Sequence, residues 1–113
     1  MSPVRVQRKR TKGWRMPENT VSVCRPGRWG NPFQIGSTGW IPVDNSGVWS
    51  KNPHPPLTRE EAVQCFRYST EFQLSDDPSY LDSLRGKNLA CFCPLDQPCH
   101  ADVLLELANK ETP

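Results

Sequence analysis

The sequence has no run of about eighteen apolar residues, the least that a membrane-spanning helix needs. Its N-terminal segment is basic and polar, without the apolar stretch of a secretory signal peptide. We therefore expect a cytoplasmic protein with no membrane partner. In that reducing compartment an odd number of cysteines, five here, is more typical of free thiols or metal ligands than of a disulfide framework.

Acidic residues are almost absent from the N-terminal quarter of the chain. Residues 1–29 contain eight of the 14 Lys and Arg residues and a single acid, Glu18. Such a segment is either a solvated basic tail or a surface that binds the phosphates of a nucleotide or nucleic acid. Trp14 and Trp29 lie among these basic residues and favour binding, because indole rings stack on bases.

Apolar residues are also scarce, at 35% of the 113 residues, which allows one domain with a modest core. Twelve prolines and seven glycines predict long loops between the helices and strands. We expect residues 1–18 to form an irregular basic arm and residues 19–113 to form a single α/β domain.

Two strands are predicted. Alternating apolar residues indicate the first over residues 20–24, and a short apolar run indicates a buried strand over residues 88–92. Between them, residues 34–57 show no sustained period. We predict a long Pro/Gly-rich loop there, with a short strand near residues 40–43.

Three helices are predicted after this loop. A capping box, in which Thr58 and Glu61 bond each other's backbone amides, starts the first helix. The second is expected over residues 77–86, with Asp77 as its N-cap, and the third begins near Pro98. This order of elements predicts a short, mostly parallel, Rossmann-like sheet flanked by helices.

Unusual loops directly follow both predicted strands. They are "RPGRWGNPF" at residues 25–33 and "CPLDQPCH" at residues 93–100. In parallel α/β sheets, ligands bind outside the carboxyl ends of the strands. We therefore expect the two loops to lie together and to form one site.

The first loop is predicted to bind a ligand, with help from two basic residues of the arm. Guanidinium groups fit phosphate as bidentate forks, glycine lets a ligand approach the backbone, and an asparagine amide reads a base edge. The alternative is a packed tryptophan beside a turn-forming Asn-Pro pair. The predicted binding residues are Arg25, Arg28, Trp29, Gly30, Asn31, Lys12 and Arg15.

The second loop contains a cluster of cysteines and one histidine, for which we consider three interpretations. In the first, the cluster supplies the four ligands of a tetrahedral zinc ion. The spacing differs from the usual zinc knuckle, in which two residues separate paired cysteines. The candidate ligands are Cys91, Cys93, Cys99 and His100.

In the second interpretation these residues perform chemistry. His100 would act as acid or base, with Cys99 or Cys93 as nucleophile. Asp96 and Asp102 are candidate orienting carboxylates, and the start of the third helix would favour a thiolate. In the third interpretation the cluster has no function: one cysteine is buried, two are loop thiols, and the histidine caps the helix.

The segments "RKRTKGWRMPENTVSVCRPGRWGNPF" and "LRGKNLACFCPLDQPCHADVLLELAN" resemble the family called domain of unknown function 4326, small proteins of phages and bacteria. The resemblance implies similarity to Rossmann-like nucleotide-binding domains and, for a phage protein, the cytoplasm of a bacterial host. The chain departs from the family at Cys24 and Ala101, where glycine is typical. The implied signature positions are Arg25, Pro26, Trp29, Gly30, Asn31, Pro32, Cys91, Cys93, Cys99, His100 and Asp102.

Together these patterns predict a protein that binds a nucleotide, a nucleoside or a nucleic acid. As an enzyme, it would act on a glycosidic or phosphate bond. The alternative is a zinc-stabilised accessory protein that binds nucleic acid without catalysis, and a protein-interaction module is a third class that the sequence leaves open.

Overall fold

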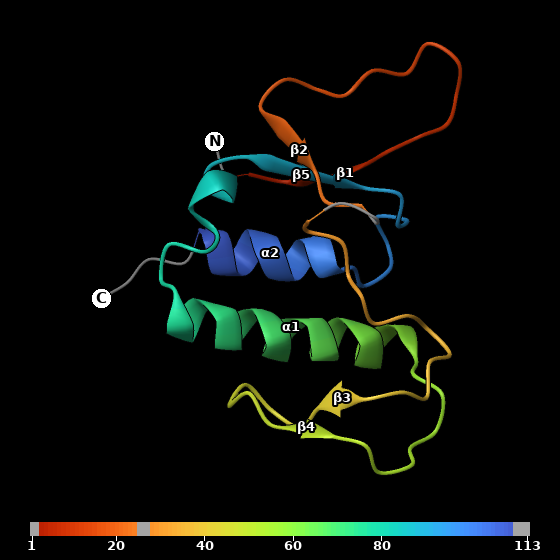
Figure 1. Ribbon diagram of the computed structural model, residues 1–113. Coiled ribbons are helices and arrows are strands. Elements are labelled where there is room, and N and C mark those ends of the chain that lie inside the picture. The colour runs from red at the N-terminus through yellow and green to blue at the C-terminus, as the bar shows by residue number, and fades with distance from the viewer. Residues whose placement is uncertain (1–2, 25–27, 110–113) are drawn as a thin grey trace.

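A computed structural model describes residues 3–24 and 28–109, which form a small α/β domain. Its main sheet contains three parallel strands, β1 (Arg5–Gln7), β5 (Asn88–Cys91) and β2 (Thr20–Ser22), with β5 in the centre (Figure 1). The parallel pairing of β2 with β5 confirms the prediction for the two sequence-derived strands.

Strand β1 lies within the segment that the sequence indicates to be an irregular arm. Its three residues pair with β5 from Arg5 opposite Leu89 to Gln7 opposite Cys91. The Val4 amide and the Asn88 side chain extend this pairing with a hydrogen bond of 3.0 Å. The strand is hard to predict because it is three residues long and its apolar alternation, Val4 and Val6, ends at the basic run that begins at Arg8.

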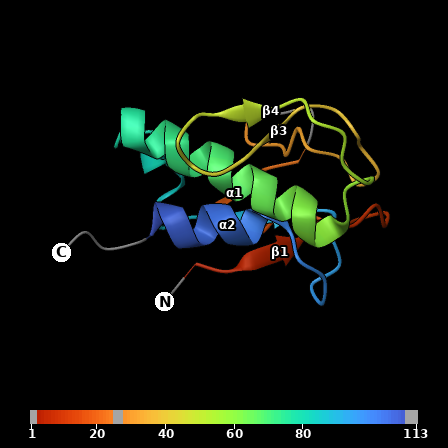
Figure 2. The ribbon, with the colours of Figure 1, turned by 90° about the horizontal axis from the view of Figure 1, so that it is seen from below.

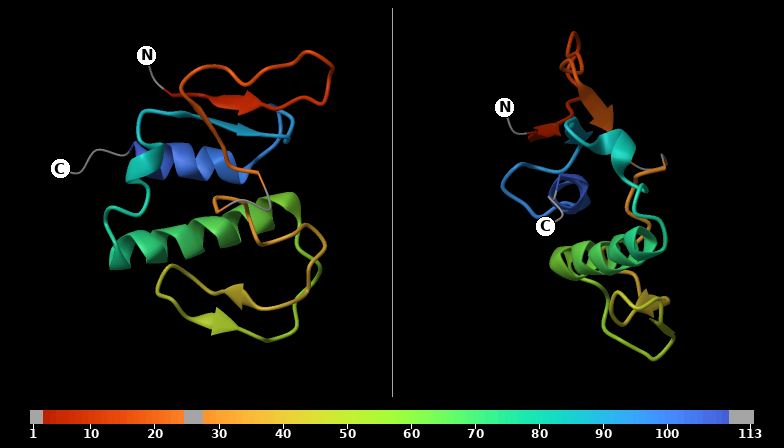
Figure 3. Two further views of the ribbon diagram at one scale, coloured as in Figure 1. Left: turned by 45° about the horizontal axis from the view of Figure 1, so that its top comes forward. Right: turned by 90° about the vertical axis from the view of Figure 1, so that its left-hand side faces the viewer.

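The helices α1 (Arg59–Asp76) and α2 (His100–Ala108) lie on the same side of the sheet (Figure 3). Helix α2 packs against β5 and β1, and α1 packs on the opposite side of α2 (Figure 2). The predicted capping box of α1 is confirmed, since the Thr58 hydroxyl accepts from the Glu61 amide and the Glu61 carboxylate accepts from the Thr58 amide.

A small antiparallel hairpin, β3 (Ile41–Pro42) and β4 (Trp49–Ser50), packs on the outer side of α1. It lies in the predicted long loop and includes the short strand expected near residues 40–43. Its turn contains Gly47 at φ +88°, and a side chain there would collide with the Phe72 ring. The hairpin forms an outer layer, well away from the main sheet.

The predicted helix over residues 77–86 is wrong. Helix α1 continues to Asp76, and the Asp77 amide donates to the Gln73 carbonyl as its C-cap. The Asp77 carboxylate accepts from the Ser79 amide and hydroxyl, which stabilises a turn in place of a helix start. Only a short 3-10 helix, η1 (Asp82–Leu84), follows.

The core lies between the sheet and the two helices. Its largest fully buried side chains come from β5, η1, α2 and the residues that flank β2 and α2, and they are Leu84, Leu89, Leu104, Val23, Val103 and Cys99. Two members of the cysteine cluster, Cys91 and Cys99, are therefore part of the packed interior. Among the described residues, no helix is long and apolar enough to cross a membrane.

Candidate functional site

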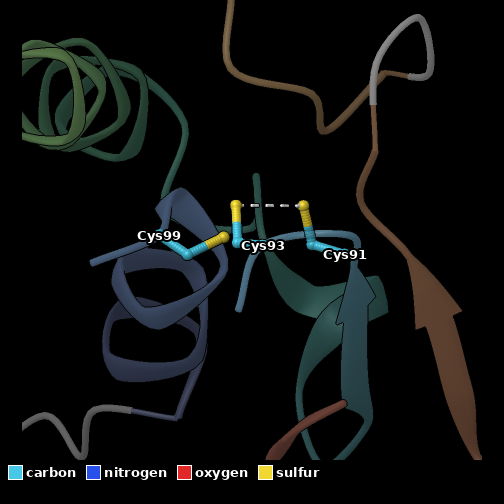
Figure 4. A group of neighbouring side chains, drawn as sticks. All are labelled: Cys91, Cys93 and Cys99. Atoms are coloured by element: carbon cyan, nitrogen blue, oxygen red, sulfur yellow. Dashed lines mark hydrogen bonds between the residues drawn. The ribbon is translucent and has the colours of Figure 1, made fainter. Parts of the chain in front are cut away.

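Three cysteine sulfurs meet where β5 ends and α2 begins (Figure 4). Cys91 is the last residue of β5, Cys93 lies in the following loop, and Cys99 precedes the first residue of α2. All three sulfurs lie within 4.8 Å of one another, and those of Cys91 and Cys93 are 3.7 Å apart. The Cys-x-Cys spacing causes this, because alternate residues of an extended chain point to the same side.

The sulfur positions fit a tetrahedral metal ion. With Zn–S bonds of about 2.3 Å, two thiolates of a tetrahedral site lie about 3.8 Å apart. The observed 3.7 Å between Cys91 and Cys93 matches this edge, and the Cys99 sulfur lies within 4.8 Å of both. Thiolates are also the ligands that zinc prefers in structural sites. His100, the fourth ligand suggested by the sequence, is not among the side chains whose ligand atoms lie this close together.

The thiols of the cluster differ in acidity. The interaction of the Cys91 thiol with the Cys99 sulfur, together with burial, raises the pKa of Cys91 to about 12. The same interaction lowers the pKa of Cys99, and a hydrogen bond from the Ala101 amide lowers it further. Cys99 is therefore the thiol of this pair that ionises first, at the N-terminus of a helix, where negative charge is favoured.

His100 is buried, and both its ring nitrogens have neighbours. Nε2 donates to the Val23 carbonyl oxygen at 2.6 Å, and Nδ1 lies 3.7 Å from the Cys99 sulfur. The ring packs edge-on against Phe66, with centroids 5.1 Å apart. The Val23 carbonyl therefore orients the His100 ring, whereas the sequence suggested a carboxylate for this role. The ring in turn orients the Cys99 side chain.

Asp102 forms an ion pair with Arg5, with the carboxylate 3.3 Å from the guanidinium. The Arg5 side chain is 8% exposed, and it also donates to the carbonyls of Pro94 and Leu95 at 3.1 and 2.7 Å. Arg5 thus fixes the loop that carries Cys93 to both β1 and α2. Sequence reasoning missed this residue, because nothing in a basic segment distinguishes a buried arginine from a solvated one.

The cysteine cluster lines a cleft of about 510 Å³. Its other walls come from the segment after β2, including Phe33 and Gln34, and from the start of α1, including Arg59. Figure 1 shows the starts of both helices and the end of β5 at the same end of the molecule. This is the carboxyl end of the parallel strands, where the sequence placed the site.

Asn31 lines this cleft, but its side chain is committed to the fold. Its amide nitrogen donates to the Ala62 carbonyl at 3.2 Å, and its oxygen accepts from the Phe33 amide at 2.8 Å. The residue is 8% exposed. It therefore joins the segment after β2 to α1, and these two bonds occupy the groups that the sequence assigned to reading a base edge.

Arg28, Trp29 and Gly30 line a separate cleft of about 260 Å³, between the segment after β2 and α1. The Trp29 ring is buried edge-on against Tyr80, and the Arg28 guanidinium lies 4.5 Å from the Trp29 ring centroid. The predicted binding loop is therefore divided between two clefts. Asn31 lines the cysteine cleft, and residues 28–30 line the other one. Predictions for Arg25, Pro26 and Gly27 lie outside the described residues.

The basic residues between β1 and β2 are mostly exposed. Lys12 and Arg15 lie in a loop that extends away from the helices (Figure 1). Arg8 and Arg10 stack on the Phe92 ring, with guanidinium carbons 4.7 and 4.4 Å from its centroid. This gives a basic and aromatic surface near the end of β5.

Neither the curated proteins nor the solved structures contain a significant match to this chain. A family model described as a domain of unknown function (DUF4326) matches residues 6–110, nearly the whole chain. This match confirms the resemblance found in the sequence, and the chain belongs to that family.

Proposed function

We propose that this protein binds a nucleotide or nucleoside in the cysteine cleft, next to a zinc ion held by Cys91, Cys93 and Cys99. The observation that carries the proposal is the approach of three thiol sulfurs to within 4.8 Å at the wall of a cleft of about 510 Å³. Three protein ligands and an open fourth position are typical of zinc sites that act on a ligand.

Two residues that are not metal ligands, His100 and Arg5, would hold the ligands of such a site in place. His100 links the Val23 carbonyl to the Cys99 sulfur and so holds that cysteine in place. Arg5 holds the loop on which Cys93 lies. Residues around a metal site orient its ligands in this way. A bound zinc ion would supply a Lewis acid at the position that faces the cleft.

A nucleotide or nucleoside is the ligand class that the surroundings favour. The cleft lies at the carboxyl end of a parallel sheet, which is where nucleotides bind in the Rossmann-like domains that the family resemblance implied. Its volume of about 510 Å³ falls within the usual range of small-molecule sites. The reactions to screen are cleavage or transfer at a glycosidic or phosphate bond.

The test is the metal content of the purified protein and of single Cys→Ser variants. We expect about one zinc ion per chain, lost in Cys93→Ser and Cys99→Ser. Cys24→Ser is the matched control, because Cys24 lines the same cleft but is not among the three clustered cysteines. Cobalt substitution should give thiolate-to-metal absorption that falls when Cys93 is removed.

Two results would contradict the zinc proposal. One is a folded protein that takes up no zinc or cobalt when these ions are supplied. The other is equal metal loss in Cys24→Ser, which would mean that any thiol substitution disturbs the cleft. Circular dichroism of each variant separates loss of metal from loss of fold.

A second candidate is a zinc-stabilised accessory protein that binds nucleic acid. The specific observation in its favour is the stacking of Arg8 and Arg10 on Phe92, beside the exposed Lys12 and Arg15. In that case affinity for a single-stranded oligonucleotide falls steeply with salt, and Arg10→Ala and Lys12→Ala each reduce the salt slope by about one. The cleft proposal instead expects a mononucleotide affinity that Arg10→Ala and Lys12→Ala leave unchanged.

A further inference from the structure

Arg59 is an arginine without a partner in the wall of the cysteine cleft. It is the first residue of α1, it is partly buried, and it lines the cleft together with the three clustered cysteines. Within residues 3–24 and 28–109 its side chain has no hydrogen bond or ion pair. No sequence pattern pointed to Arg59, because a basic residue at a helix start is common on protein surfaces.

Three other arginines of the fold are ion-paired. Arg5 pairs with Asp102, Arg67 with Glu106 and Arg85 with Asp82. Among the residues that the structure describes, none engages the guanidinium nitrogens of Arg59, so they are available to a ligand that enters the cleft. A ligand with an anionic group would pair with them.

The remaining lining of the cleft agrees with an anionic ligand. In the part of the chain that the structure describes, no Asp or Glu lines the cleft, and Arg59 is its one basic side chain apart from the engaged His100. Gln34 contributes an exposed amide that can donate to an oxygen. Apolar groups of Phe33, Ile35 and Val63 make up much of the rest.

We propose that Arg59 binds the anionic group of the ligand, so that the cleft selects a phosphate-bearing nucleotide over an uncharged nucleoside. This inference rests on the proposed function of the cleft and names its ligand class. The guanidinium would hold two phosphate oxygens as a bidentate fork, while the rest of the ligand extends towards the cysteines. The cation of this site is thus Arg59 on α1, and Arg28 faces the other cleft.

A different role for Arg59 is to balance the charge of the cysteine thiolates. Three thiolates on a zinc ion have a net charge of minus one, which a nearby guanidinium would offset. The two roles make different predictions. A counter-ion affects the affinity for zinc, whereas a ligand-binding residue affects the affinity for the phosphate.

The experiment is calorimetric titration of the zinc-loaded protein with AMP and with adenosine. We expect AMP to bind about tenfold to a hundredfold more tightly than adenosine, as for a charge-assisted bidentate contact. Arg59→Met should abolish this difference and leave adenosine binding and zinc content unchanged. Arg59→Lys should retain part of it, because lysine keeps the charge and loses the fork.

Arg67→Met is the matched control, because Arg67 lies on the same helix, is ion-paired with Glu106 and does not line this cleft. It should keep the full preference for AMP. The inference is overturned if wild-type protein binds AMP no better than adenosine, or binds neither. It is also overturned if Arg59→Met keeps the preference while its zinc affinity falls.

The same titrations on metal-free Cys93→Ser protein separate this inference from the zinc proposal. A preference for AMP that persists there and still requires Arg59 supports the anion site even if the metal proposal fails. Loss of the preference in a folded, zinc-loaded Arg59→Met variant supports both proposals together. Melting temperatures of the Arg59 and Arg67 variants identify any loss caused by unfolding.

Discussion

The guanidinium of Arg5 lies 3.3 Å from the carboxylate of Asp102, so the first strand of the sheet is ion-paired to the first turn of α2. The same guanidinium donates hydrogen bonds to two backbone carbonyls in the loop between Cys93 and Cys99. One buried side chain therefore joins three segments that surround the sulfur cluster. Its removal should affect both the stability of the fold and the order of the loop.

We predict that Arg5→Met lowers the free energy of unfolding by about 2 to 3 kcal/mol, because the charged hydrogen bonds are lost and the loop carbonyls stay unpaired. Urea denaturation measures this change. Arg15→Met, at an exposed position, should change stability by less than about 0.5 kcal/mol. Equal stability of the two variants would show that the Arg5 contacts contribute nothing.

Asn31→Ala should also destabilise the protein, by about 1 to 3 kcal/mol, because two buried hydrogen bonds are lost, one to the Ala62 carbonyl of α1 and one from the Phe33 amide. Gln34→Ala is the comparison, since Gln34 lines the same cleft but is exposed. Thermal unfolding of both variants measures the effect. If Asn31 instead reads a ligand, as the sequence suggested, its variant would lose affinity for AMP at unchanged stability.

Substitution of His100 tests whether the metal has three or four protein ligands. We expect His100→Phe to retain about one zinc ion per chain, because His100 is outside the clustered set and its Nε2 is bonded to Val23. Stability should fall by about 1 to 3 kcal/mol, since the Val23 carbonyl loses its donor. Elemental analysis and urea denaturation give the two values. Zinc loss as complete as in Cys99→Ser would instead make His100 a ligand.

His54 should make stability depend on pH. Both its ring nitrogens donate to carbonyls, of Gly39 at 2.8 Å and of Pro55 at 2.7 Å, and these bonds raise the pKa of His54 above 6.5. A raised pKa means that the folded state favours the protonated ring. The stabilisation is therefore complete below about pH 6.5 and is lost as pH rises through the folded-state pKa.

The measurement is urea denaturation of wild type and His54→Ala from about pH 5.5 to pH 8.5, a range that brackets the ordinary histidine pKa. The stability difference between the two proteins should shrink as pH rises. A difference that grows with pH would reverse the sign and contradict the two hydrogen bonds. The titration of the His54 ring by NMR gives its pKa directly.

The sequence allowed prediction of the elements that have strong local signals. The capping box at Thr58 predicts the start of α1, and the apolar run at residues 88–92 predicts β5. Strand β1 has no such signal, because it is a strand only through its pairing with β5, far away in the chain. Asp77 shows a local signal that misleads. Aspartate often caps the start of a helix, but here Asp77 is the C-cap of α1 and its carboxylate stabilises the turn that follows.

The position of the cysteine cluster at the end of β5 was also predictable, whereas the other residues that line its cleft were not. The Cys-x-Cys spacing at the end of β5 predicted that the side chains of Cys91 and Cys93 lie on the same side of the chain. In the structure their sulfurs do lie together. The cation of the cleft, Arg59, comes from the start of α1 and not from the basic N-terminal segment. Which of 14 basic residues faces a cleft depends on how the helices pack, and no local pattern contains that information.

The position of β5 between β1 and β2 has a consequence for the order in which the molecule assembles. The chain must bring Arg5 to Leu89 before the sheet exists, and contacts between such distant residues form slowly. A nascent chain that has emerged only to residue 87 has neither the central strand nor α2. We therefore expect Cys24 and Cys65, the two cysteines before that point, to meet oxidants or alkylating agents without protection during synthesis.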